Sequence, residues 1–88
     1  MKITIYKTTV CPFSAYLLDD LNRKSVAVEV KVIDKNQDDA LEMIRLTGSS
    51  FTPVVKIAKD DGSEVVVEGY NIDKKKKISQ MLGVDLGS

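Results

Sequence analysis

Histidine is absent from this chain of 88 residues, and cysteine occurs once, as Cys11. Without histidine, no imidazole can act as a base, and the usual Cys/His zinc site cannot be assembled. A single cysteine also excludes a disulfide within the chain. Any side-chain chemistry is therefore expected to centre on the thiol of Cys11.

The sequence also lacks net charge and long apolar runs. Its 13 basic residues balance 13 acidic ones, whereas general attraction to nucleic acid or anionic membranes requires excess basic charge. The longest apolar run covers residues 15–18, far short of the roughly 20 residues of a membrane span or the apolar stretch of a signal peptide. We therefore expect a cytoplasmic protein that binds neither nucleic acid nor membrane, in a compartment where a free thiol persists.

An apolar fraction of 43% and a charged fraction of 30% are typical of a globular protein. At this length we expect residues 1–88 to form one domain, with residues 83–88 as a short tail. No metal-ligand cluster is apparent. Asp19 and Asp20 are interpreted as solvated acids, and Asp38, Asp39 and Glu42 as exposed helix charges.

The periodicity of apolar residues predicts the element order βαβαββα. Strands are expected at residues 2–6, 26–33, 54–58 and 64–68, and helices after Cys11, after Asn36 and after Asn71 or Asp73, the last two ending near Gly48 and Gly83. The second helix is expected to bury Ala40, Leu41 and Ile44, perhaps with Met43, and the third Ile78, Met81 and Leu82. A right-handed crossover makes the first two strands parallel, and a tight turn at residues 60–62 makes the last two a hairpin. The fold class is therefore α/β, with a four-stranded mixed sheet and three helices on its two faces.

Cys11 lies at the predicted junction between the first strand and the first helix. Unpaired N–H groups at a helix N-terminus favour a thiolate. Pro12 suits the first helical turn, the Ser14 hydroxyl is placed to donate a hydrogen bond to the sulfur, and Lys7 adds positive charge nearby. The alternative is that Cys11 is a small buried hydrophobe; its position favours a reactive thiol.

Three segments together resemble the glutaredoxins, which belong to the thioredoxin superfamily. They are Cys11-Pro12-Phe13-Ser14 after the first strand, Thr52-Pro53 before the third strand, and Gly69-Tyr70-Asn71 after the fourth. The resemblance extends from Lys2 to about Leu82, and it implies a thioredoxin fold and a single glutaredoxin-like domain.

The resemblance implies a role for each of these residues. Cys11 matches the nucleophile, with Pro12 and Ser14 beside it, and Pro53 matches a cis-proline that follows Thr52, whose backbone pairs with the substrate. Gly69, Tyr70 and Asn71 match the segment that holds the γ-glutamyl carboxylate of glutathione. Lys7 approximates the residue that pairs with the glycyl carboxylate, although it lies four positions before Cys11 rather than the usual three. Phe13, with Tyr6, Tyr16 and Tyr70, is a candidate for lining the groove.

The expected function is that of a glutathione-dependent thiol–disulfide oxidoreductase. Glutathione is the co-substrate, disulfide-containing or glutathionylated proteins are the partners, and the protein is expected to act as a monomer. Because Ser14 stands where dithiol relatives have a second cysteine, an outside thiol must resolve any mixed disulfide on Cys11. Ser14 is either natural or a Cys→Ser substitution.

Two other functions remain open. The segments Pro53-Val54-Val55 and Gly69 to Asp73 also resemble the redoxins that donate electrons to ribonucleotide reductase and are recharged by thioredoxin reductase. Glutathione-using relatives often have an acid at the position of Asn71, and an amide there weakens the contact with the glutathione amine. Monothiol relatives hold iron–sulfur clusters with glutathione, although they generally have glycine in place of Pro12. The lysines 74–77 are either a solvated face or a patch for acidic partners or glutathione carboxylates.

Overall fold

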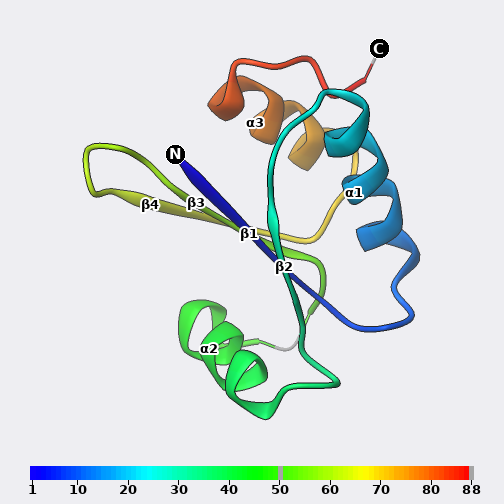
Figure 1. Ribbon diagram of the computed structural model, residues 1–88, viewed down its shortest axis with the longest axis vertical. Helices are drawn as coiled ribbons and strands as arrows, with labels where there is room; N and C mark the ends of the chain where they lie inside the picture. The colour runs from blue at the N-terminus through cyan, green and yellow to red at the C-terminus, as the bar shows by residue number, and fades with distance from the viewer. Residues whose placement is uncertain (50, 88) are drawn as a thin grey trace.

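The computed structural model describes residues 1–49 and 51–87, and the predicted order βαβαββα is confirmed. The elements follow the chain from the N-terminus to the C-terminus in Figure 1. They are β1 (Lys2–Lys7), α1 (Pro12–Arg23), β2 (Glu29–Val32), α2 (Gln37–Thr47), β3 (Val54–Ala58), β4 (Glu64–Glu68) and α3 (Ile72–Leu82).

The four strands form one mixed sheet in the order β2-β1-β3-β4. β1 runs parallel to β2, with Ile5 opposite Val30, and antiparallel to β3, with Ile5 opposite Val55. β3 and β4 form the antiparallel hairpin. This order places β1 and β3 in the centre of the sheet, and the chain segments that follow β1 and precede β3 meet at the same end.

The helices cover both faces of the sheet, as expected: α1 and α3 lie on one face and α2 on the other (Figure 1). Alternation along β1 explains the two layers, because successive side chains of a strand point to opposite faces. The larger layer contains Ile3 and Ile5 of β1 with Leu17 of α1. The smaller layer contains Tyr6 of β1 with Met43 of α2.

The second helix buries a different stripe from the one predicted. Asn36 caps α2 by accepting a hydrogen bond from the Asp39 N–H at 3.2 Å, and Gly48 ends it at a φ of 70°. Met43 is fully buried, whereas Leu41 and Ile44 are both 44% exposed. The prediction was wrong for Leu41 and Ile44, because α2 is rotated so that Met43 and Leu46 pack against the sheet.

The start of β2 differs from the sequence-based expectation, and the segment predicted as a short tail packs against the domain. β2 begins at Glu29 rather than at Val26, because the Val26 N–H donates to the Leu21 carbonyl and keeps the chain bound to the end of α1. The segment after Gly83 is not a loose tail. Leu86 is 1% exposed and belongs to the core beside Leu21, although Ser88 lies outside the described residues. The Leu86 N–H also donates to the Ser79 hydroxyl at 3.2 Å.

Within residues 1–49 and 51–87, no helix combines the length and apolar character needed to cross a membrane.

Candidate functional site

Cys11 is the N-cap residue of α1. Its backbone is extended, with φ −144° and ψ 98°, and its carbonyl accepts the first helical hydrogen bond from the Ala15 N–H at 3.1 Å. Pro12 occupies the first helical position, where its missing N–H leaves no partner unpaired. The cysteine is half-buried. The sequence therefore places its thiol at the positive end of a helix, as predicted.

Two hydroxyl groups lie beside the Cys11 sulfur. The buried Ser14 donates from Oγ to Sγ at 2.7 Å, and Thr52 Oγ1 lies 3.4 Å from the same sulfur. Burial raises the pKa of the Cys11 thiol, but these hydrogen bonds and the positive charge of Lys7 outweigh it, so that the net pKa lies below the usual value. The site therefore favours the thiolate form of Cys11 more than an unperturbed cysteine would.

Thr52 lies two residues before the start of β3, at the end of the sheet where β1 leads into Cys11. The Thr52–Pro53 peptide bond is cis, as the family resemblance implied, and Pro53 is buried at the start of the strand. The side-chain contact of Thr52 was not predicted from the sequence, where only its backbone was assigned a role. A residue with a hydroxyl group directly before this proline was the sequence feature from which the contact could have been predicted.

The turn formed by Gly69, Tyr70 and Asn71 follows β4 and adjoins the cis-proline. The Gly69 N–H donates to the Pro53 carbonyl at 2.7 Å, and Gly69 adopts a φ of 79°, which glycine tolerates best. Asn71 is the N-cap of α3 and accepts a hydrogen bond from the Lys74 N–H at 2.9 Å. The structure thus brings the proline segment and the glycine segment together.

A groove of about 290 Å³ opens between α1 and the start of α3. Phe13 and Tyr16 contribute exposed aromatic side chains, 58% and 66% exposed respectively. The groove is lined by Phe13, Tyr16, Asp20, Tyr70, Asn71, Ile72 and Lys75. Three of the four predicted aromatic residues are therefore present, beside the residues expected to hold a carboxylate.

Tyr6 is not part of this groove, contrary to the sequence-based suggestion. It is fully buried on the α2 face of the sheet, where its hydroxyl donates to the Glu42 carboxylate at 2.7 Å. Strand alternation is the reason, since Tyr6 points away from the face that Ile5 shares with α1. Glu42 is correspondingly half-buried and bonded, so its interpretation as an exposed charge was also wrong.

The lysines of α3 do not form a uniformly solvated face. Lys75 is half-buried and pairs with Asp20 of α1, with 3.2 Å between Nζ and Oδ2. Asp20 itself is only 5% exposed, which corrects its assignment as a solvated acid. Lys76 and Lys77 are exposed.

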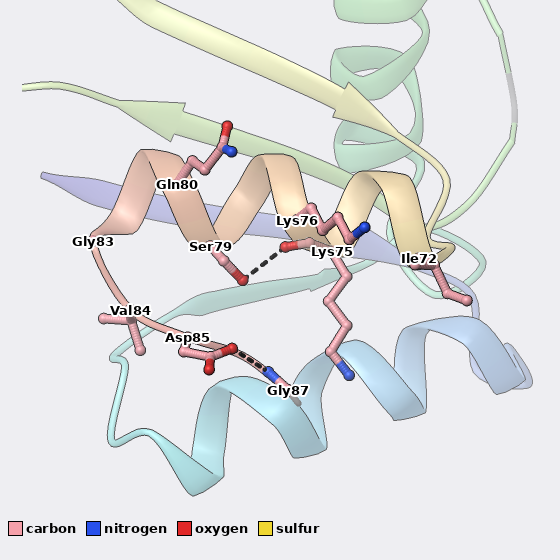
Figure 2. A pocket seen from close by; sticks show the side chains of 9 residues that line it. All are labelled: Ile72, Lys75, Lys76, Ser79, Gln80, Gly83, Val84, Asp85 and Gly87. Carbon is pink, nitrogen blue, oxygen red and sulfur yellow. Dashed lines mark hydrogen bonds between the residues drawn. The ribbon is translucent and has the colours of Figure 1, made fainter.

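A larger pocket, of about 390 Å³, lies between α3 and the segment that follows it (Figure 2). It is lined by Ile72, Lys75, Lys76, Ser79, Gln80, Gly83, Val84, Asp85 and Gly87. Because neither Cys11 nor Thr52 contributes to it, this pocket is separate from the thiol. In the part of the chain that the structure describes, no group of three or more His, Cys, Asp or Glu side chains is arranged to hold a metal ion.

Comparisons with known proteins agree with the fold. The family model described as Glutaredoxin matches residues 3–62, while no curated protein matches the chain. A mutant of the thioredoxin-like protein BC3987 gives a TM-score of 0.77 at 29% identity, over 94% of this chain and 96% of that one. The glutaredoxin grx-1 of Archaeoglobus fulgidus gives 0.71 at 27% identity, over 92% and 85%. Buckwheat glutaredoxin, solved as a glutathione complex, shares the fold, with a TM-score of 0.65 at 16% identity over 96% and 71%.

The family match includes Cys11, Ser14 and the Thr52–Pro53 pair, and it ends before Gly69. The fold extends the likeness over almost the whole chain. The fold is therefore a glutaredoxin-like thioredoxin fold, and the chain belongs to the glutaredoxin family, whose members are generally thiol–disulfide oxidoreductases.

Proposed function

We propose that the protein exchanges its Cys11 thiol with glutathione mixed disulfides by a monothiol route. The observation that carries the proposal is the environment of the only sulfur nucleophile, which accepts a hydrogen bond from Ser14 at 2.7 Å. This donor stabilises the attacking thiolate. It also makes Cys11 a better leaving group when a second thiol attacks it.

The reaction proceeds in two exchanges. In the first, the Cys11 thiolate attacks the glutathione sulfur of a protein–glutathione disulfide, forming a Cys11–glutathione disulfide and releasing the protein thiolate. In the second, a glutathione thiolate attacks the glutathione sulfur of that disulfide. The products are oxidised glutathione and the Cys11 thiolate, so each cycle consumes one reduced glutathione and joins it to the glutathione removed from the substrate.

The surroundings of Cys11 fit such a ligand. The Thr52 hydroxyl lies 3.4 Å from the sulfur, so the backbone of Thr52, before the cis bond to Pro53, is the candidate for pairing with a substrate cysteine as a short strand. The N-terminus of α3, capped by Asn71, suits the γ-glutamyl carboxylate. Lys7 lies close enough to Cys11 to lower its pKa and is the candidate for the glycyl carboxylate.

Mass spectrometry of the protein after incubation with oxidised glutathione tests the proposal. We expect a mass increase of one glutathione on Cys11, together with release of glutathione from a glutathionylated peptide in the presence of reduced glutathione. Cys11→Ser serves as the control and should show neither. A protein without an adduct, or a Cys11→Ser variant with unchanged activity, would contradict the proposal.

One observation supports a second candidate, the redoxin function coupled to thioredoxin reductase. Asn71 replaces the acid often found in glutathione-using relatives, and its side-chain oxygen is already engaged with the Lys74 N–H. That leaves no carboxylate at this position for the glutathione amine. Reduction of the disulfide of a Ser14→Cys variant by thioredoxin reductase, but not by glutathione, would favour the redoxin function.

A further inference from the structure

A buried carboxylate far from the thiol connects α1 with the start of α3. Asp20 lies more than two turns beyond Cys11 in α1 and is 5% exposed. The Tyr70 hydroxyl donates to its Oδ2 at 2.6 Å, and Lys75 Nζ lies 3.2 Å from the same oxygen. The Arg23 guanidinium pairs with the other oxygen, Oδ1.

These contacts keep Asp20 charged despite its burial. Burial raises the pKa of its carboxyl, but the contacts with Tyr70, Lys75 and Arg23 outweigh it and hold the net pKa below the usual value. A carboxylate that is 5% exposed accepts strong hydrogen bonds, because little water competes for its oxygens. The Tyr70 hydroxyl is therefore held firmly against α1.

Asp20 is also the polar connection between two parts of the site. Of the hydrogen bonds and ion pairs among the described residues, those that join α1 to residues 69–82 all involve Asp20. Figure 2 shows Lys75 extending from α3 toward α1. Cys11 is the N-cap of α1, and the proposed binding site for the γ-glutamyl carboxylate lies at the N-terminus of α3.

The opposite side of the turn is fixed by the sheet. The Gly69 N–H binds the Pro53 carbonyl at 2.7 Å, at the start of β3. The turn 69–71 is therefore held from two directions, by Pro53 and by Asp20. A ligand whose sulfur contacts Cys11 and whose carboxylate contacts this turn requires a fixed distance between Cys11 and the turn. A small displacement of the ligand's sulfur from the thiolate reduces the reaction rate strongly.

We propose that Asp20 is a positioning residue for glutathione. Through the Tyr70 hydroxyl it sets the distance between the turn 69–71 and Cys11, so that the γ-glutamyl group reaches the N-terminus of α3 while the disulfide reaches the thiolate. Asp20 does not touch the reacting sulfur. This inference rests on the proposed function, since it assigns a role in binding the same ligand.

The test compares oxidised glutathione with a small disulfide that lacks the γ-glutamyl group together with the rest of the tripeptide. Second-order rate constants are measured for Cys11 with oxidised glutathione and with 2-hydroxyethyl disulfide, which lacks that group. We expect Asp20→Leu and Tyr70→Phe each to lower the ratio of the two constants about tenfold, the effect of one lost hydrogen bond to a charged group. The pH profile of Cys11 alkylation by iodoacetamide should not change.

The conservative variant distinguishes positioning from charge. Asp20→Asn keeps an oxygen that accepts the Tyr70 hydrogen bond, so its ratio should stay within about twofold of the wild type. The double variant, Asp20→Leu with Tyr70→Phe, should lose about tenfold rather than a hundredfold, because both changes remove the same contact. If Asp20→Leu does not fold, the rate ratio of Tyr70→Phe tests the inference.

Three results would overturn the inference. In the first, Asp20→Leu and Tyr70→Phe slow both disulfides equally, which indicates a general structural effect. In the second, Asp20→Asn loses as much as Asp20→Leu, which assigns the effect to charge. In the third, the wild-type protein reacts no faster with oxidised glutathione than with 2-hydroxyethyl disulfide; this outcome alone contradicts the proposed function as well.

Discussion

Replacing Glu42 with glutamine should destabilise the protein in a pH-dependent way. The Glu42 carboxylate receives the Tyr6 hydroxyl at 2.7 Å and the Lys31 ammonium at 2.8 Å, with Lys56 at 3.5 Å. Hydrogen bonds with Lys31 and Tyr6 lower the pKa of Glu42 from 4.5 to about 2, against the opposing effect of burial. The network joins α2 to β1, β2 and β3, so the fold itself depends on it.

The size of the effect follows from this pKa. Each pKa unit corresponds to about 1.4 kcal/mol, so a full shift would contribute about 3.4 kcal/mol. The side chain is 36% exposed, however, and solvent screens its ion pairs. We therefore expect Glu42→Gln to lower the free energy of unfolding at pH 7 by about 1.5 kcal/mol, a decrease in Tm of about 6–12 °C for a domain of this size.

The dependence on pH gives the decisive measurement. Because the pKa of Glu42 is lower in the folded protein than in the unfolded chain, its stabilising contribution is complete above pH 4.5 and is lost as the pH falls toward 2. Urea denaturation measures the difference in the free energy of unfolding between wild type and Glu42→Gln. We expect this difference at pH 3 to be less than half of its value at pH 7. Glu64→Gln, which removes the same charge from an exposed position on β4, is the matched control. An equal loss at both pH values would refute the reasoning.

The other predictions concern the thiol and the end of the chain. Ser14→Ala should raise the pKa of Cys11, and Thr52→Val should raise it less, because the two hydroxyl oxygens lie 2.7 Å and 3.4 Å from the sulfur. The midpoint of the rate of iodoacetamide alkylation against pH measures both changes. A larger increase for Thr52→Val than for Ser14→Ala would contradict the assigned contacts. Leu86→Ala should cost about 2–4 kcal/mol, because it empties a buried site. Leu41→Ala, at a position 44% exposed, should cost less than about 1 kcal/mol. Equal losses in urea denaturation would show that the C-terminal segment does not pack as described.

The features predicted correctly from the sequence depend on neighbours along the chain. The element order followed from apolar periodicity and from the glycines and asparagines that end and begin helices. The contact between Ser14 and Cys11 followed from helix geometry, since residues three apart lie on the same side of a helix. The cis-proline at Pro53 followed only from the family resemblance.

The features that were missed depend on which segments meet in space. The Asp20 carboxylate is buried only because Tyr70, 50 residues away, and Lys75 approach it from the other helix. Glu42 is bonded only because α2 packs over Tyr6. Periodicity gives the stripe of a helix but not its rotation against the sheet, which is why Leu41 and Ile44 were assigned to the core and are exposed.

The strand order also determines where the backbone of the sheet remains open. β2 and β4 are the outer strands, and among the described residues each has one edge of N–H and C=O groups without a neighbouring strand. Both strands carry charge: Glu29 and Lys31 on β2, and Glu64 and Glu68 at the two ends of β4. A strand of another molecule that added to either edge would have to desolvate the exposed carboxylates of Glu29, Glu64 and Glu68, so these residues protect the sheet from edge-to-edge aggregation.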